Sequence, residues 1–202
     1  NLNDKDGKQV FYDVKADLLK ELSKDSDGHP FVDLFINTHP HEDHCLGFGE
    51  HYYSGKVANY DDEKDKDKII IGELWVTPIV MSNEECEDAK DIRKEAKRRR
   101  KLYKDDDSFK GSYGNYLRII GYDKDKEFDK RYSYIPGTTV STANGSSLKW
   151  LDMFIHAPFK EDIEGSKATK NKNDASIVIQ YAFKIEGEDK PKCKLLIGGD
   201  AE

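Results

Sequence analysis

Phe35-Ile-Asn-Thr-His-Pro-His-Glu-Asp-His44 places three histidines and an aspartate within six residues, directly after a short apolar segment. The potential ligands are His39, His41, Asp43 and His44. Imidazole nitrogens and carboxylate oxygens suit Zn²⁺, Mn²⁺ or Fe, and the absence of a cysteine pair disfavours a purely structural zinc site. A strand that ends in a tight loop can turn several such side chains into one pocket. The stretch therefore predicts a metal site rather than a histidine-rich surface loop.

Short segments rich in β-branched and aromatic residues predict strands on both sides of this motif. These segments are Val10–Tyr12, Phe31–Ile36, Ile69–Ile71 with Leu74–Val76, Leu148–Ile155, Ser176–Phe183 and Cys193–Ile197. Asn144-Gly145 suits a type I′ hairpin turn. Helices are expected at Val14–Leu22, from its apolar spacing, and at Ser82–Tyr103, which opens with a capping-box pattern. Strands that alternate with helices in this way predict an α/β protein.

The composition is rich in charge and poor in apolar residues. Of 202 residues, 36% are charged, and the net charge is −7. Such a balance can indicate disorder, but aromatic residues make up 11% of the chain and the apolar residues cluster in short runs. We therefore expect a single domain over residues 1–202, with solvated charged insertions near 61–68 and 123–131.

Three further segments extend the pattern of the histidine motif along the chain. Val10-Phe-Tyr-Asp13 ends in an aspartate, and Phe154-Ile-His156-Ala-Pro158 carries a histidine at a strand end. Leu195-Leu-Ile-Gly-Gly-Asp200 ends in an aspartate after two glycines. Together with the H-x-H-x-D-H motif, these segments resemble the metallo-β-lactamase superfamily. The resemblance implies an α/β (α+β) fold, a four-layer αββα sandwich, and a hydrolase that binds two divalent metal ions.

The resemblance also implies the metal, its ligands and the catalytic groups. Zinc is the expected metal, with Mn or Fe as alternatives. A hydroxide that bridges the two metals is the expected nucleophile, and Asp43 and Asp200 are the expected catalytic residues. The implied ligands are His39, His41 and His156 for the first metal, Asp43 and His44 for the second, and Asp200 between them.

The residues themselves leave alternatives open at three of these positions. Asp200 could be a turn aspartate after a strand, and His156 could be a structural histidine at a strand end. Asp13, which in the family braces the metal loop, could equally cap the helix that follows it. The H-x-H-x-D-H motif therefore carries most of the prediction.

A narrower resemblance concerns two segments in the last third of the chain and the proline of the histidine motif. Asn173-Asp-Ala-Ser-Ile-Val-Ile179, then Leu195–Glu202, and the proline in Thr38-His-Pro-His41 are similar to the hydrolase domain of ComEC-type DNA-uptake proteins and their stand-alone relatives. The family has a further metal-binding histidine after another strand, whereas this sequence ends at Glu202. We therefore expect a sandwich that is incomplete at its C-terminus and a second metal site without its last ligand.

One basic segment bears on the substrate. Between Arg93 and Lys104, eight of twelve residues are Lys or Arg. On a helix they create a local positive field that can bind phosphates, which makes Arg98, Arg99 and Lys101 candidate substrate-binding residues. With the ComEC-like pattern, this favours hydrolysis of a phosphodiester, in a nucleic acid or a nucleotide. The alternative is a solvated helix that is paired with acidic loops.

Two other functions remain compatible with the sequence. One is a metallo-hydrolase of esters, thioesters, lactones or β-lactams. The other is a non-catalytic binding or regulatory module that retains a partial metal site. No apolar stretch approaches the roughly 18–20 residues of a membrane span, and no basic-then-apolar leader opens the chain. We therefore expect a cytoplasmic protein without a transmembrane segment, whose oligomeric state the sequence leaves open.

Overall fold

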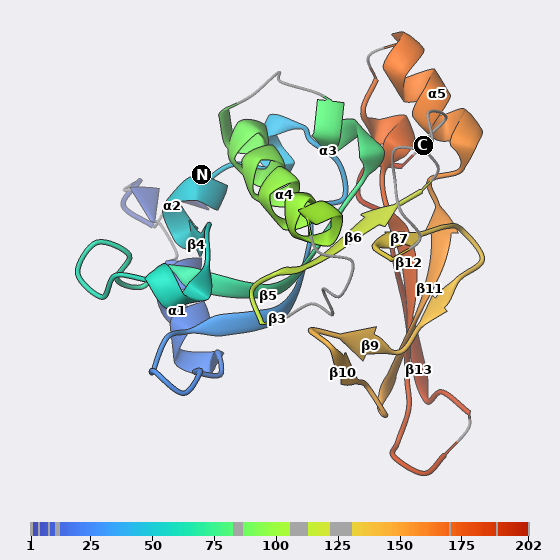
Figure 1. Cartoon of the computed structure of the whole chain (residues 1–202). Coiled ribbons are helices and arrows are strands. Elements are labelled where there is room, and N and C mark those ends of the chain that lie inside the picture. The colour runs from blue at the N-terminus through green and yellow to red at the C-terminus, as the bar shows by residue number, and fades with distance from the viewer. Residues whose placement is uncertain are drawn as a thin grey trace.

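The computed structural model describes residues 2–3, 5–7, 9–10, 13–82, 87–105, 113–121, 131–169, 171–188 and 190–201. Within these ranges the chain is a mixed α/β structure, with a parallel sheet beside an antiparallel sheet (Figure 1). The parallel sheet has the order β3-β5-β6-β7, and β4 also pairs with β5. Its strands are β3 (Phe31–Ile36), β4 (Tyr52–Tyr53), β5 (Ile69–Val76), β6 (Tyr116–Ile120) and β7 (Ser133–Tyr134).

The larger antiparallel sheet has the order β13-β12-β11-β8, and two short hairpins stand apart from it. In the β9–β10 hairpin, Asn144 and Gly145 both have positive φ angles, of 49° and 75°, as a type I′ turn requires. The antiparallel strands are β1 (Leu2–Asn3), β2 (Gln9–Val10), β8 (Thr139–Val140), β9 (Thr142–Ala143), β10 (Ser146–Ser147), β11 (Leu151–Ala157), β12 (Val178–Phe183) and β13 (Cys193–Ile197).

Most helices lie beside the sheets at the ends of strands. In the described ranges, none is both long and apolar enough to span a membrane. The α-helices are α1 (Val14–Glu21), α2 (Phe48–His51), α3 (Pro78–Ser82), α4 (Glu87–Asp105) and α5 (Lys160–Thr169), and the 3₁₀ helices are η1 (Glu42–His44), η2 (Val57–Asn59) and η3 (Asn173–Ala175).

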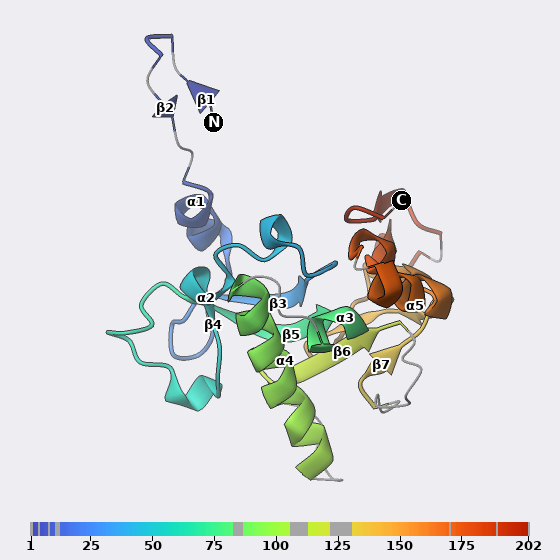
Figure 2. The same cartoon turned by 90° about the horizontal axis from the view of Figure 1, so that it is seen from above.

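Two apolar clusters place these elements in layers. In the first, α2, α3 and α4 pack on the parallel sheet, with Ile92 of α4 against Leu74 of β5 and its neighbours. In the second, Trp75 of β5 packs with Met153 of β11 and Ile179 of β12, so the two sheets face each other. β5 is buried along its whole length because it is covered on both faces, which explains its almost continuous apolar sequence. Figure 2 shows α5 beside α3 and the C-terminus, at one end of these layers.

The structure confirms several of the predicted elements. β3 and β13 have the predicted bounds, and α1 and α4 cover most of the predicted helices. The 61–68 segment is a series of mostly exposed turns, as its mixed charges predicted. β6 was not predicted, although its sequence Tyr116-Leu-Arg-Ile-Ile120 is mostly apolar and aromatic. The Phe11–Tyr12 part of the first strand, the capping box that begins at Ser82, and all of the 123–131 insertion except residue 131 lie outside the described residues.

Arg99 ties α4 to the beginnings of β5 and β6. Its side chain is 1% exposed, and it donates to Glu95 Oε1 at 2.7 Å. It also donates to the carbonyls of Ile71 at 2.9 Å and Tyr116 at 2.8 Å. These donors bind main-chain oxygens at the buried beginnings of the two strands.

This placement gives no support to the prediction that Arg98 and Arg99 bind substrate. Arg98 also donates to Glu95, at 2.7 and 2.8 Å, and to Asn115 at 2.9 Å, so protein groups occupy both guanidinium groups. Lys101 is 75% exposed but lies on the next part of the same helix. This part of α4 is beside Ile71, whereas the histidine motif follows the strand end opposite Trp75, about 13 Å further along β5 at ~3.3 Å per residue.

We expect Arg99→Ala to destabilise the chain by about 3–5 kcal/mol, because it removes one of the two guanidinium partners of the buried Glu95 carboxylate and the buried donor to the Ile71 and Tyr116 carbonyls. The matched variant Lys101→Ala should change the free energy of unfolding by less than ~0.5 kcal/mol, since its side chain is in solvent. Urea unfolding followed by circular dichroism measures both. Equal effects of the two substitutions would contradict the structural role of Arg99.

Candidate metal centre

The loop that carries the H-x-H-x-D-H motif lies between the two sheets. It begins at the carboxyl end of β3, where the Asn37 N–H donates to the Trp75 carbonyl at 3.0 Å. One residue later, the Thr38 carbonyl accepts a hydrogen bond of 3.0 Å from the Ile177 N–H, which precedes β12. The parallel sheet therefore holds the loop on one side and the antiparallel sheet holds it on the other.

Two histidines of this loop meet an aspartate that is more than 150 positions away in sequence. His44 Nε2 is 3.2 Å from Asp200 Oδ2, and His39 Nε2 is 3.9 Å from the same oxygen. One ligand atom from each of the three residues lies within 4.8 Å of the other two. Asp200 follows β13, so the pairing of β13 with β12 brings the carboxylate to the loop. The structure thus brings the H-x-H-x-D-H motif close to Asp200, the aspartate that the metallo-β-lactamase resemblance implied as a shared ligand.

His41 and Asp43 lie at the margin of this group. His41 Nδ1 is 3.1 Å from His39 Nε2, and Asp43 Oδ2 is 3.6 Å from His44 Nε2. The Asp43 side chain is 78% exposed, whereas His39 is fully buried. The motif therefore has a buried end at His39 and a solvent-exposed end at Asp43.

His156 is not part of the group, although the resemblance implied that it is a ligand. It is exposed on β11, and its ring centroid is 4.7 Å from that of Phe154. Ile155 points into the core between the sheets, so His156 shares the opposite face of the strand with Phe154. The register with β12 shifts between Ile155 and Ala157, which leaves His156 at an irregularity of the ladder. Strand alternation therefore places the His156 side chain on the exposed face of β11, beside Phe154.

Asp13 has the second of its two predicted roles. Its side chain accepts a hydrogen bond of 2.8 Å from the Ala16 N–H and caps α1. This contact is local to the helix terminus, so the structure gives no reason to assign Asp13 to the metal loop.

Burial determines the protonation of the central histidine. Loss of solvent, and then the charges of His44 and His41, lower the pKa of the His39 imidazole to about 4, although Asp200 and Asp43 oppose the shift. His39 is therefore neutral at physiological pH, which is the form that ligates metals. Two imidazoles and a carboxylate with one wholly buried member form a donor set that fits Zn²⁺.

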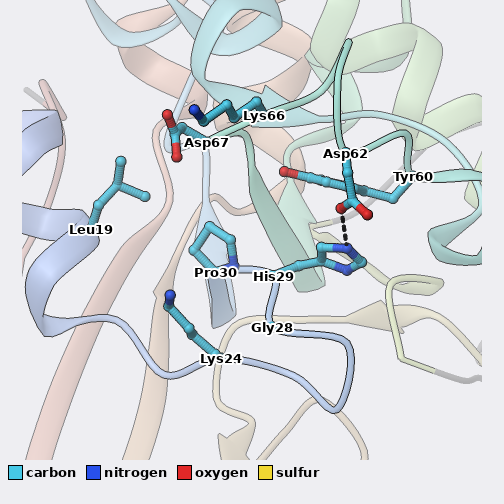
Figure 3. Close-up of a pocket in the computed structure, with 9 residues that line it drawn as sticks. All are labelled: Leu19, Lys24, Gly28, His29, Pro30, Tyr60, Asp62, Lys66 and Asp67. Atoms are coloured by element: carbon cyan, nitrogen blue, oxygen red, sulfur yellow. Dashed lines mark hydrogen bonds and ion pairs between the residues drawn. The ribbon is translucent and has the colours of Figure 1, made fainter.

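His29 lines a cavity of about 180 Å³ (Figure 3), and it belongs to a second group of histidine and aspartate side chains. Its members, Asp25, Asp27 and His29, bring ligand atoms within 4.8 Å of one another. His29 already has a carboxylate at each ring nitrogen, with Asp25 Oδ2 at 3.3 Å from Nδ1 and Asp62 Oδ1 at 3.0 Å from Nε2. These contacts fasten the charged 61–68 segment to the loop before β3. The D-x-D-G-H spacing was the sequence signal for this group.

Relatives supply no ligand assignment for comparison. No family model, curated protein or solved structure matches the chain. The candidate centre is therefore defined by the positions of His39, His44 and Asp200.

The lowered pKa of His39 predicts how stability depends on pH in chelator-treated protein. An unfolded histidine has a pKa of about 6.5, so between pH 6.5 and 4 the unfolded chain binds a proton that the folded chain does not. We expect the free energy of unfolding to fall as the pH drops through this window. Urea unfolding at several pH values measures the change, and an NMR titration of His39 measures its pKa directly. A His39 pKa above 6 would contradict the prediction.

Proposed function

We propose that the chain is a metal-dependent hydrolase with the four-layer αββα sandwich of the metallo-β-lactamase superfamily. The observation that carries the proposal is the meeting of His39 and His44 with Asp200 at the ends of two strands in different sheets. The facing of a parallel and an antiparallel sheet, with α2, α3 and α4 outside the first, supports the architecture.

The residues present fit a site for one or two zinc ions. His39 and His41 would hold the first ion, Asp43 and His44 the second, and Asp200 would contact both. The position of Asp200 supports this shared role, because its Oδ2 approaches a histidine of each pair, at 3.9 and 3.2 Å. When bound, zinc supplies a Lewis acid and lowers the pKa of water.

The chain's own side chains would orient the reactants. The Asp43 side chain is 78% exposed, so it can accept a hydrogen bond from a water molecule that enters the site. Asp200 is 43% exposed and can do the same from the opposite segment. The buried His39 keeps the inner side of the site closed to water, which strengthens the electrostatic interactions there.

We further propose a phosphodiester, in a nucleic acid or a nucleotide, as the substrate. The ComEC-like pattern of Asn173–Ile179 and Leu195–Glu202 supports this choice. The basic helix α4 gives no further support for a phosphodiester substrate, because Arg98 and Arg99 bind Glu95 and lie away from the candidate centre.

A second candidate is a metal-binding module without hydrolase activity. One observation favours it: His156 lies outside the group, so the described residues provide fewer ligands than the resemblance implies. The two candidates differ in turnover but agree on metal binding.

Metal content and a substrate panel test the proposal. We expect the purified chain to bind at least one zinc ion and, with Zn²⁺ or Mn²⁺, to cleave bis-p-nitrophenyl phosphate or single-stranded DNA. Turnover of acyl esters, thioesters or lactones alone would replace the phosphodiester substrate by an acyl one. Bound zinc without any turnover would favour the binding module, and the absence of bound metal would refute both.

His44→Ala and Asp200→Asn should each abolish stable zinc binding and reduce turnover to background, because each removes a ligand atom from the group. His51→Gln is the matched control, since this histidine ends α2 outside the group. Metal analysis after gel filtration gives the zinc content, and circular dichroism shows whether each variant folds. Wild-type zinc content in a folded His44→Ala variant would remove the proposed centre.

A further inference from the structure

Two hydroxyl groups from distant segments converge on one nitrogen of His39. Thr38 Oγ1 and Ser176 Oγ each lie 3.2 Å from His39 Nδ1. Ser176 and His39 are both fully buried, so water does not compete for the contact between them, while Thr38 is partly buried. The opposite nitrogen, Nε2, is the one that faces Asp200.

The presence of two hydroxyl oxygens beside His39 Nδ1 indicates whether this nitrogen donates or accepts. A bare Nδ1 has a single lone pair and accepts from only one hydroxyl, whereas an Nδ1–H can be shared between two oxygen acceptors. Since both hydroxyls are at the same distance, the arrangement suits Nδ1 as the donor. A neutral imidazole carries one proton, so Nε2 then keeps its lone pair for a metal.

The same hydroxyl pair also touches the chain just before Asp200. A Cβ atom at Gly199 would lie 2.8 Å from Thr38 Oγ1 and 3.4 Å from Ser176 Oγ. Only a residue without a side chain fits against the two hydroxyls, and Gly199 also has a positive φ angle of 54°. The pair therefore lies between the His39 ring and the backbone that presents the carboxylate.

We propose that Thr38 and Ser176 are positioning residues for the metal centre. Their hydroxyls fix the His39 imidazole as the Nδ1–H tautomer and direct Nε2 toward Asp200. The inference rests on the proposed metal site, and it adds the residues that prepare this site before the metal binds. Partners that orient a ligating histidine in this way commonly contribute 10–100-fold to metal affinity.

NMR of the metal-free chain, with isotope-labelled histidine, tests the tautomer directly. Long-range proton–nitrogen correlations report which ring nitrogen carries the proton. We expect His39 to be the Nδ1–H tautomer at neutral pH, and to become mixed or Nε2–H when Thr38→Val is combined with Ser176→Ala. An Nε2–H tautomer in the wild-type chain would overturn the inference.

Zinc affinity, measured by competition with a chromophoric chelator, gives a second readout. The double variant should lose affinity roughly 10–100-fold, whereas Thr38→Ser keeps a hydroxyl and should retain the wild-type value. Ser166→Ala is the matched control, because Ser166 is also buried but lies in α5 outside this cluster. Wild-type affinity in a folded double variant would overturn the inference. If the double variant does not fold, Ser176→Ala alone must still lower the affinity or change the tautomer population.

These measurements separate this inference from the proposed function. A wild-type chain that binds no zinc refutes the function, while the tautomer of the metal-free chain still decides the role of the hydroxyls. A chain that binds zinc equally well without them refutes the positioning role and leaves the metal centre in place.

Discussion

The hydrogen bond between the Ile177 N–H and the Thr38 carbonyl joins the loop after β3 to the antiparallel sheet. It forms beside His39, whose ring is buried where the two sheets meet. A buried imidazole needs partners for both nitrogens, and here they come from Thr38 and Ser176 on one edge and from His41 and Asp200 on the other. The candidate centre therefore depends on the sheets being held at a fixed separation.

Packing between the sheets provides that separation. Trp75 from β5 and Ile179 from β12 belong to one buried cluster, and each apolar side chain of this size contributes roughly 1.5–3 kcal/mol when it is removed from water. On the other face of β5, α4 is fastened by Arg99, whose donors satisfy carbonyls at the beginning of the strand. Arg99 of the basic segment is thus part of the structure of this layer, at the end of the sheet opposite to the histidine motif.

Periodicity and residue type were sufficient to predict much of the fold. β3 and β13 are runs of β-branched, aromatic and other apolar residues with clear limits, and the Asn144-Gly145 turn has a strong local signal. β6 was not predicted, and it contains Arg118, whose guanidinium lies over the Tyr134 ring at 5.1 Å. That contact stabilises a cation inside a sheet, and it exists only when β6 and β7 are paired.

The candidate ligands His39, His41, Asp43 and His44 could be recognised from the sequence, because they are neighbours in one loop. Asp200 was also indicated, through its position after an apolar run and two glycines. Which of these groups meet depends on the tertiary structure. Strand pairing brought Asp200 to His44, strand alternation turned His156 to another face, and helix direction carried Arg99 to the far end of β5. These outcomes depend on contacts between distant segments, which no local pattern encodes.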